Sequence, residues 1–167
     1  MESFHEYLDE YKIQLQKGAI KKAYQGLMHY IMDLRTYFKS KYPDHFVSGN
    51  IYYGYMDMTY FSFFPWSLKI RGLKIGIVFI HETCSFEIWL FGYNKEIQSK
   101  YWNLFKEAGW NKYRLVATTK GADSILEHPI DGADFSDLSG LTRRIEAAAM
   151  QFTEDIESFL TRHEMCQ

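Results

Sequence analysis

The sequence predicts an α+β fold, in which a mainly antiparallel sheet of four to five strands is covered by helices. Two apolar runs, residues 73–80 and 85–93, are joined by the polar corner 81–84, which is typical of a β-hairpin. On both sides of this hairpin lie long segments whose apolar residues recur at helical spacing. The predicted order of elements is α-α-β-β-β-α-β-β-α.

The N-terminal region predicts two helices. Ser3, followed three residues later by Glu6, is a capping-box start, and Gly18 is expected to end the first helix. A second helix is expected over residues 19–39, and Pro43 closes the region. We expect the two helices to form a hairpin whose apolar stripes face the sheet or each other.

A first strand is expected over residues 49–64, because aromatic and β-branched side chains dominate that segment. Gly54 within it indicates a bend or a bulge, and Pro65 ends it. Residues 66–72 are interpreted as a connection that leads into the central hairpin.

The two strands of the central hairpin do not alternate cleanly between apolar and polar residues, so both faces of the sheet are expected to be mostly covered. Gly76 weakens its strand unless a neighbouring group packs closely over it. Glu87 lies between aromatic residues, where an ionised carboxylate is costly unless it is paired.

The C-terminal half predicts a helix, two short strands and a last helix. Asn94 is a good N-cap for a helix over residues 95–108. Residues 113–118 and 124–128 are expected to be strands. The last helix has a regular apolar stripe and runs to about residue 161. Two residues can cap it, Asp134 or Ser136.

Length and composition indicate one domain over residues 1–167 that needs no metal or disulfide to hold its core. A formal net charge of −2 predicts no nucleic-acid partner and no anionic membrane partner. Cys84 and Cys166 do not form a disulfide framework. No segment has the pattern of a signal peptide or a membrane span, so we expect a cytoplasmic protein.

Three stretches of the chain carry a family resemblance: residues 54–61, residues 74–79, and residues 86–90 together with Asn94 and Gln98. The chain resembles an uncharacterised family of small bacterial proteins, a domain of unknown function. The resemblance covers most of the chain and implies a bacterial cytoplasmic protein with no known activity. It supplies no catalytic residue.

An aromatic wall with a few polar groups is the first candidate site, because ligand pockets are apolar with a small number of convergent polar residues. Carboxylates beside aromatic rings also suit a cationic or planar ligand. The same aromatic residues are equally explained as core under a helix. The candidate ligand-binding residues are Tyr55, Asp57, Phe61, Trp66, Arg71, Glu87 and Trp89.

A nuclease-like or other hydrolase that uses Asp57 and Glu87 is the alternative. The order α-β-β-β-α-β also occurs in restriction-endonuclease-like folds, and carboxylates suit Mg²⁺. The position two residues after Glu87 is Trp89 and not the lysine that such sites use. We therefore predict no catalytic residue.

No metal site or cofactor is predicted. The six histidines show no paired spacing, and Cys84 has no neighbouring base in the sequence. Aromatic surface left uncovered by the helices predicts self-association as a homodimer. A small basic group, Lys69, Arg71 and Lys74, is interpreted as a solvated edge.

The function predicted from the sequence is thus a small cytoplasmic ligand-binding or protein-interaction domain without proven catalysis. Any ligand is expected on the aromatic face around Asp57, Trp66, Glu87 and Trp89.

Overall fold

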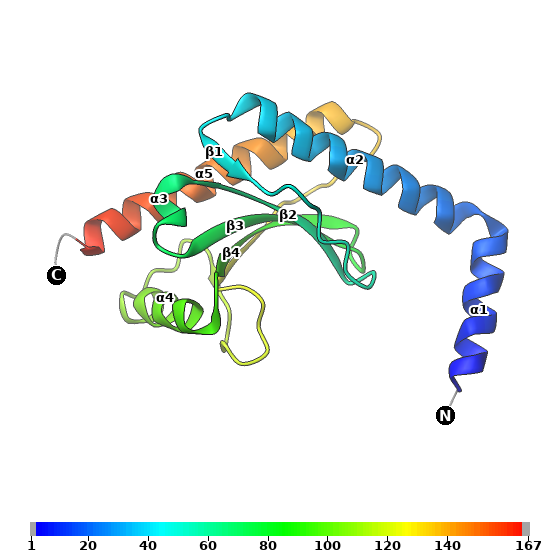
Figure 1. Ribbon diagram of the computed structural model, residues 1–167, viewed down its shortest axis with the longest axis horizontal. Helices are drawn as coiled ribbons and strands as arrows, with labels where there is room; N and C mark the ends of the chain where they lie inside the picture. The colour runs from blue at the N-terminus through cyan, green and yellow to red at the C-terminus, as the bar shows by residue number, and fades with distance from the viewer. Residues whose placement is uncertain (1–2, 165–167) are drawn as a thin grey trace.

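A computed structural model describes residues 3–164 of the chain (Figure 1). Six strands form one sheet in the order β1-β2-β3-β4-β6-β5, and every neighbouring pair is antiparallel. This confirms the predicted α+β class, although the sheet has six strands where four to five were predicted. The strands are β1 His45–Val47, β2 Met58–Pro65, β3 Leu73–Ile80, β4 Ser85–Gly92, β5 Arg114–Leu115 and β6 Leu126–Pro129.

Five helices surround the sheet in the described part of the chain. The two long helices α2 and α5 run along one face, α4 lies on the opposite side, and α1 projects away from the body (Figure 1). The helices are α1 Phe4–Lys17, α2 Ala19–Lys41, α3 Trp66–Lys69, α4 Lys95–Glu107 and α5 Leu138–Glu164.

The hydrophobic core lies between the sheet and the pair α2 and α5. Phe61, Ile77 and Ile88 are aligned across β2, β3 and β4, and each is at most 1% exposed. Phe38 of α2 packs on this face with its ring 4.6 Å from that of Phe63. Burial of this apolar surface is the main force that holds the two helices on the sheet.

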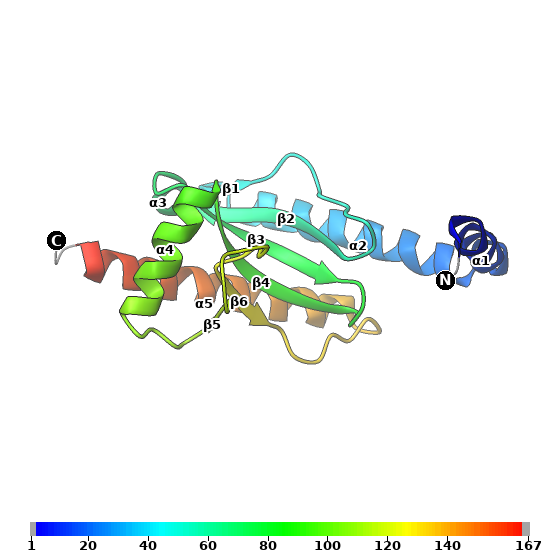
Figure 2. The same ribbon diagram turned by 90° about the horizontal axis from the view of Figure 1, so that it is seen from below.

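On the opposite face of the sheet α4 crosses near one end (Figure 2), and aromatic rings of β2 and β4 pack over the strands. Tyr60 stacks on Phe91 at 5.3 Å, and Trp89 lies 5.9 Å from Phe91. A Cβ on Gly76 would lie 2.4 Å from the Phe91 ring. Because Gly76 has no side chain, the Phe91 ring can lie directly over this strand. This is the close neighbour that the sequence predicted for a glycine at this position.

The segment 49–64 is only partly a strand, which corrects the prediction. Gly54 and Met56 have φ of 68° and 63°, which interrupts an extended chain, so β2 begins at Met58. The segment before it approaches β2 in a single bridge, Tyr52 to Tyr60. The short edge strand β1 was not predicted.

Helix α1 does not fold back on α2, so the predicted helical hairpin is wrong. An antiparallel helical pair needs a loop of a few residues, and here Gly18, with φ of 81°, is the only connecting residue. The capping box of Ser3 and Glu6 is confirmed. No residue of α1 is buried.

The C-terminal half follows the predicted order of elements, but the strands predicted over 113–118 and 124–128 are shorter, with β5 at Arg114–Leu115 and β6 at Leu126–Pro129, and the start of α5 differs. Asn94 caps α4 by accepting a hydrogen bond from the Ile97 N–H at 2.9 Å. Asp137 accepts a bond from the Gly140 N–H at the start of α5, so neither predicted residue is the cap. Cys166 lies outside the described residues. No described helix is long and apolar enough to cross a membrane.

Candidate functional site

The predicted site residues fall into four places. Phe61 is 1% exposed and packs against Phe38 in the core, on the helix-covered face. Glu87 and Trp89 lie on the other face, in β4. Tyr55 and Asp57 lie in the turn before β2, and Trp66 and Arg71 lie at the opposite end of the sheet, around α3.

Glu87 has the partners that its surroundings require. It accepts a hydrogen bond from Trp89 Nε1 at 2.5 Å, and Arg114 Nη2 lies 3.7 Å from its Oε2. Arg114 is also paired with Glu127 on β6. Two carboxylates thus share one guanidinium, which ties β4, β5 and β6 together at this edge of the sheet.

Asp57 holds the turn that precedes β2. Its Oδ1 accepts a hydrogen bond from the Tyr55 N–H at 2.8 Å. Backbone hydrogen bonds from Met58 and Tyr55 lower the pKa of this exposed carboxyl. Tyr55 is 93% exposed. With Trp89 these two residues line a shallow hollow of about 500 Å³.

The two carboxylates of the hydrolase alternative do not lie together. Asp57 precedes the Met58–Ile80 pair, whereas Glu87 faces Val78, the partner of Tyr60. Three residues along the strands and two strand spacings across give roughly 14 Å between the two backbones. Among the described residues no three His, Cys, Asp or Glu side chains gather as a metal site would need.

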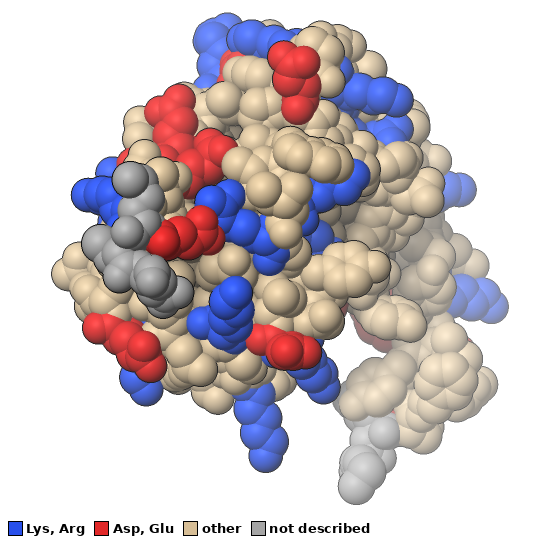
Figure 3. Space-filling model, turned by 60° about the vertical axis from the view of Figure 1, so that its left-hand side comes forward, with Lys and Arg blue, Asp and Glu red and all other residues tan. Residues whose placement is uncertain are grey.

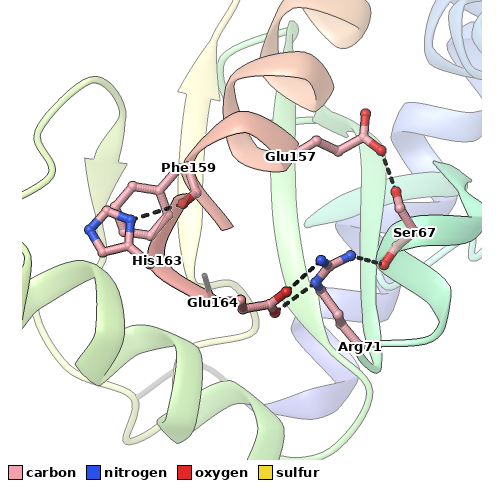
Figure 4. Close-up of polar contacts among 6 residues, drawn as sticks. All are labelled: Ser67, Arg71, Glu157, Phe159, His163 and Glu164. Carbon is pink, nitrogen blue, oxygen red and sulfur yellow. Dashed lines mark hydrogen bonds and ion pairs between the residues drawn. The ribbon is translucent and has the colours of Figure 1, made fainter. Parts of the chain in front are cut away.

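Arg71 joins the segment after α3 to the end of α5 (Figure 4). Its Nε and Nη2 donate to the two carboxylate oxygens of Glu164 at 2.8 and 2.6 Å, and Nη1 donates to the Ser67 carbonyl at 2.6 Å. Ser67 in turn donates to Glu157. The hydrogen bond from Arg71 lowers the pKa of Glu164. Arg71 is therefore a structural cross-link at this corner.

A groove opens beside this cross-link, with a volume of about 690 Å³. We call it the corner groove. Apolar side chains from β1, β2, α3 and the start of α4 form most of its surface, and serines and basic residues complete it. It is lined by Phe46, Ser48, Ser62, Phe64, Lys69, Ile70, Arg71, Gly72, Leu73, Lys74, Tyr93 and Ile97.

Backbone geometry at Gly72 shapes one wall of the corner groove. Gly72 has φ of 72°, and its carbonyl accepts a hydrogen bond from the Tyr93 N–H at 2.8 Å. A Cβ at this position would lie 3.3 Å from Ile97. The glycine thus brings the start of β3 directly against the first turn of α4.

Two lysines of the corner groove have no carboxylate partner within the described residues. Lys69 Nζ lies 5.0 Å from the Phe46 ring and 4.9 Å from the Trp66 ring. Lys74 Nζ lies 5.7 Å from the Phe91 ring. Figure 3 shows Lys and Arg side chains near the middle of this end of the molecule, with acidic side chains beside them.

Sequence reasoning found part of this groove and missed the rest. Arg71 was predicted as a site residue, and Lys69 and Lys74 were interpreted as a solvated edge. Phe46 and Ile70 come from segments that no periodic pattern marks, and Tyr93 is the last residue of the apolar run 85–93. The available signal was that exposed apolar residues lie next to those three basic residues in segment 66–74.

Comparison with known proteins gives one match. The model of a family described as Domain of unknown function (DUF7000) matches residues 4–160. No curated protein and no solved structure matches the chain.

Proposed function

We propose that this chain, which belongs to the DUF7000 family of unknown function, binds a small anionic molecule with an apolar body. The proposal rests on the geometry of the corner groove. The observation that carries this proposal is a concave apolar surface with two lysines that have no carboxylate partner among residues 3–164. Exposed apolar surface of this kind marks binding sites, and few other polar groups interrupt it.

The apolar part of the groove supports binding of a hydrophobic body. Ile70 and Tyr93 are 65% and 80% exposed, although each lies beside buried neighbours, Leu73 and Phe64, in the same groove. Covering these side chains with a ligand would remove apolar surface from water at about 25 cal/mol per Å². This favours a ligand that has an aliphatic chain or a ring system.

The charges of the groove support an anionic head group. The ammonium groups of Lys69 and Lys74 lie over aromatic rings and pair with no carboxylate of the described part of the chain, so a bound anion would gain their attraction without breaking an ion pair seen there. The N-terminal end of α4, which borders the groove at Tyr93 and Ile97, adds the positive end of a helix dipole. Arg71 is committed to Glu164 and acts on the groove by holding its wall.

Decanoate and decanol are suitable probes, because they share one apolar chain and differ in charge. We expect decanoate to bind about 2- to 5-fold more tightly than decanol, since partly exposed ion pairs contribute up to about 1 kcal/mol. Isothermal titration or displacement of a fluorescent anionic dye measures both affinities. The double variant Lys69→Gln/Lys74→Gln should remove the preference and keep most of the decanol affinity.

Lys39→Gln is the matched control, because Lys39 is exposed in the last turn of α2, away from the groove. This variant should bind both probes as the unchanged protein does. A preference for decanoate that survives in the double variant would place the anion elsewhere. The absence of saturable binding by either probe would contradict the proposal.

Five other inferences from the sequence stay predictions: a ligand at Tyr55, Asp57, Glu87 and Trp89, the hydrolase alternative, the homodimer, the bacterial origin and the cytoplasmic location. The separation of Asp57 from Glu87 gives the hydrolase alternative no support from geometry.

A further inference from the structure

The N-terminal arm, which we define as residues 4–22, carries an apolar stripe that the body of the molecule does not cover. Phe4, Tyr7, Leu8 and Tyr11 recur at intervals of three and four residues, and they are 76%, 59%, 45% and 56% exposed. Such side chains lie on one side of a helix. In Figure 3 the arm is separated from the body by an open gap.

A helix of this kind needs a partner to be stable. Isolated helices shorter than about 12–15 residues are marginal in water, and α1 has 14 residues. Most helices in proteins gain their stability from packing of the apolar face, and α1 has no buried residue. The capping box and the left-handed Gly18 define the ends of α1 but supply no apolar contact.

We propose that the N-terminal arm pairs with the arm of a second copy of the chain, antiparallel and around a two-fold axis. The two apolar stripes would face each other, as in an isologous interface. This assembly uses none of the corner-groove residues, so it is independent of the proposed ligand site.

The charge sequence of the arm favours the antiparallel arrangement of two identical arms. Residues 4–10 of α1 carry only acidic charges, Glu6, Asp9 and Glu10, apart from the titratable His5. Residues 12–17 of α1 carry only basic charges, Lys12 and Lys17, and Lys21 and Lys22 follow in α2 after the bend at Gly18. Antiparallel pairing brings each acidic half against a basic half and also opposes the two helix dipoles.

The apolar area of the arm is close to what a specific dimer needs. A buried aromatic side chain covers about 150–250 Å², and each arm offers Phe4, Tyr7 and Tyr11 together with Leu8 and Ile20. Two such arms approach the lower bound of about 1,200 Å² of total buried surface for specific interfaces. We therefore expect a reversible dimer that forms in the micromolar range.

Sedimentation velocity of the full chain, from nanomolar to high micromolar concentration, tests the proposal. We expect a monomer–dimer equilibrium whose dissociation constant rises at least tenfold in Tyr7→Glu/Tyr11→Glu. Ile13→Glu is the matched control, because Ile13 is 46% exposed on the opposite side of α1, and it should leave the dimer unchanged. Circular dichroism shows whether each variant keeps its fold.

Charge reversal gives a second test that leaves the apolar stripe intact. Lys12→Glu/Lys17→Glu makes the arm acidic and should weaken the dimer severalfold at low salt. Adding Asp9→Lys/Glu10→Lys reverses four of the five formal charges of α1, keeps the capping-box residue Glu6, and should restore the dimer. An equal weakening by both sets would contradict antiparallel pairing.

Three other outcomes overturn the proposal. A dimer that Tyr7→Glu/Tyr11→Glu does not weaken uses another surface. A monomer at every concentration with slow amide exchange in α1 would show that the stripe packs on its own body. A monomer with fast exchange in α1 that becomes slow on lipid vesicles would assign the stripe to a membrane surface.

Discussion

At the scale of single residues, two kinds of position decide how this sheet is covered. Gly76 leaves room for the Phe91 ring, and Gly54 meets the Met58 carbonyl so closely that a Cβ would lie 2.2 Å from its oxygen. Charged residues are the second kind, because Glu87 and Glu146 are ionisable groups among aromatic rings and each has several partners. In both cases one side chain, or its absence, determines the local packing.

Gly76→Ala should destabilise the protein by about 1–3 kcal/mol, because the added methyl must displace the Phe91 ring from a packed face. Urea unfolding measures the change. Gly26→Ala is the control, since no atom lies within 4 Å of a Cβ at Gly26 in α2, and it should stabilise the helix by up to about 1 kcal/mol. Equal effects of the two substitutions would contradict the packing argument.

Glu146 should make stability depend on acid pH. Burial disfavours its ionised form, but hydrogen bonds from Lys41, Tyr42 and Tyr37 outweigh burial and lower its pKa from 4.5. The unfolded chain therefore binds the proton more readily, so the contribution of Glu146 is present at neutral pH and is lost as pH falls through and below 4.5.

Glu146→Gln should accordingly cost about 1–3 kcal/mol at pH 7, and this cost should shrink at pH values below the lowered pKa of Glu146. Urea unfolding at a series of pH values measures it. Glu154→Gln, an exposed glutamate of the same helix, should change stability by less than about 0.5 kcal/mol. A cost that stays constant with pH would show that the charge of Glu146 does not matter.

At the scale of elements, the helices of this chain have unequal roles. α2 and α5 contribute most of the buried helical residues, while α4 buries Gln98, Tyr101 and Phe105 and packs Phe105 4.7 Å from Phe159 at the far end of α5. α3 is a single turn, and the ion pair of Arg71 and Glu164 ties the segment that follows it to α5. α1 has no such attachment to the sheet.

Arg71→Met should loosen the end of α5 without unfolding the body. The pair is partly exposed, so we expect a loss of stability of at most about 1 kcal/mol. Hydrogen exchange should be faster in the last turns of α5 than in the unchanged protein. Arg162→Met removes a cation that, among the described residues, bonds to the Ser158 carbonyl of its own helix, so it should speed exchange in the last turns of α5 much less. A similar effect of both variants would contradict the cross-link.

At the scale of the whole molecule, the chain consists of one sheet-centred body and a projecting arm (Figure 1). The two proposals use different parts of it, because the corner groove lies at the end near α3 and the arm lies beyond the N-terminal end of α2. A ligand and a second copy can therefore bind at the same time. A variant that loses ligand binding can therefore still dimerise, and a variant that loses dimerisation can still bind the ligand.

A variant that begins at Gly18 should keep the fold of the body. No residue of α1 is buried, so the free energy of unfolding in dilute solution should change by less than about 1 kcal/mol. The melting temperature of the full chain should rise with protein concentration, and that of the shortened chain should not. A loss of several kcal/mol in dilute solution would show that α1 supports the body.

The sequence by itself determined the elements that depend on local chemistry and on period. The hairpin of β3 and β4, the capping box of α1 and the Asn94 cap of α4 all follow from neighbouring residues, and the structure confirms them. The need of Gly76 for a close neighbour and of Glu87 for a partner also followed from local chemistry.

Only the tertiary structure decided which surfaces meet. Periodicity places Phe61 and Trp89 on strand faces, but only the packing of α2 and α5 shows that the face of Phe61 is the one these two helices cover. The corner groove joins β1, α3 and α4, which are far apart in sequence, and the direction of α1 depends on one left-handed glycine. Contacts between distant segments leave no local pattern, which is why the sequence predicted the parts and not the site.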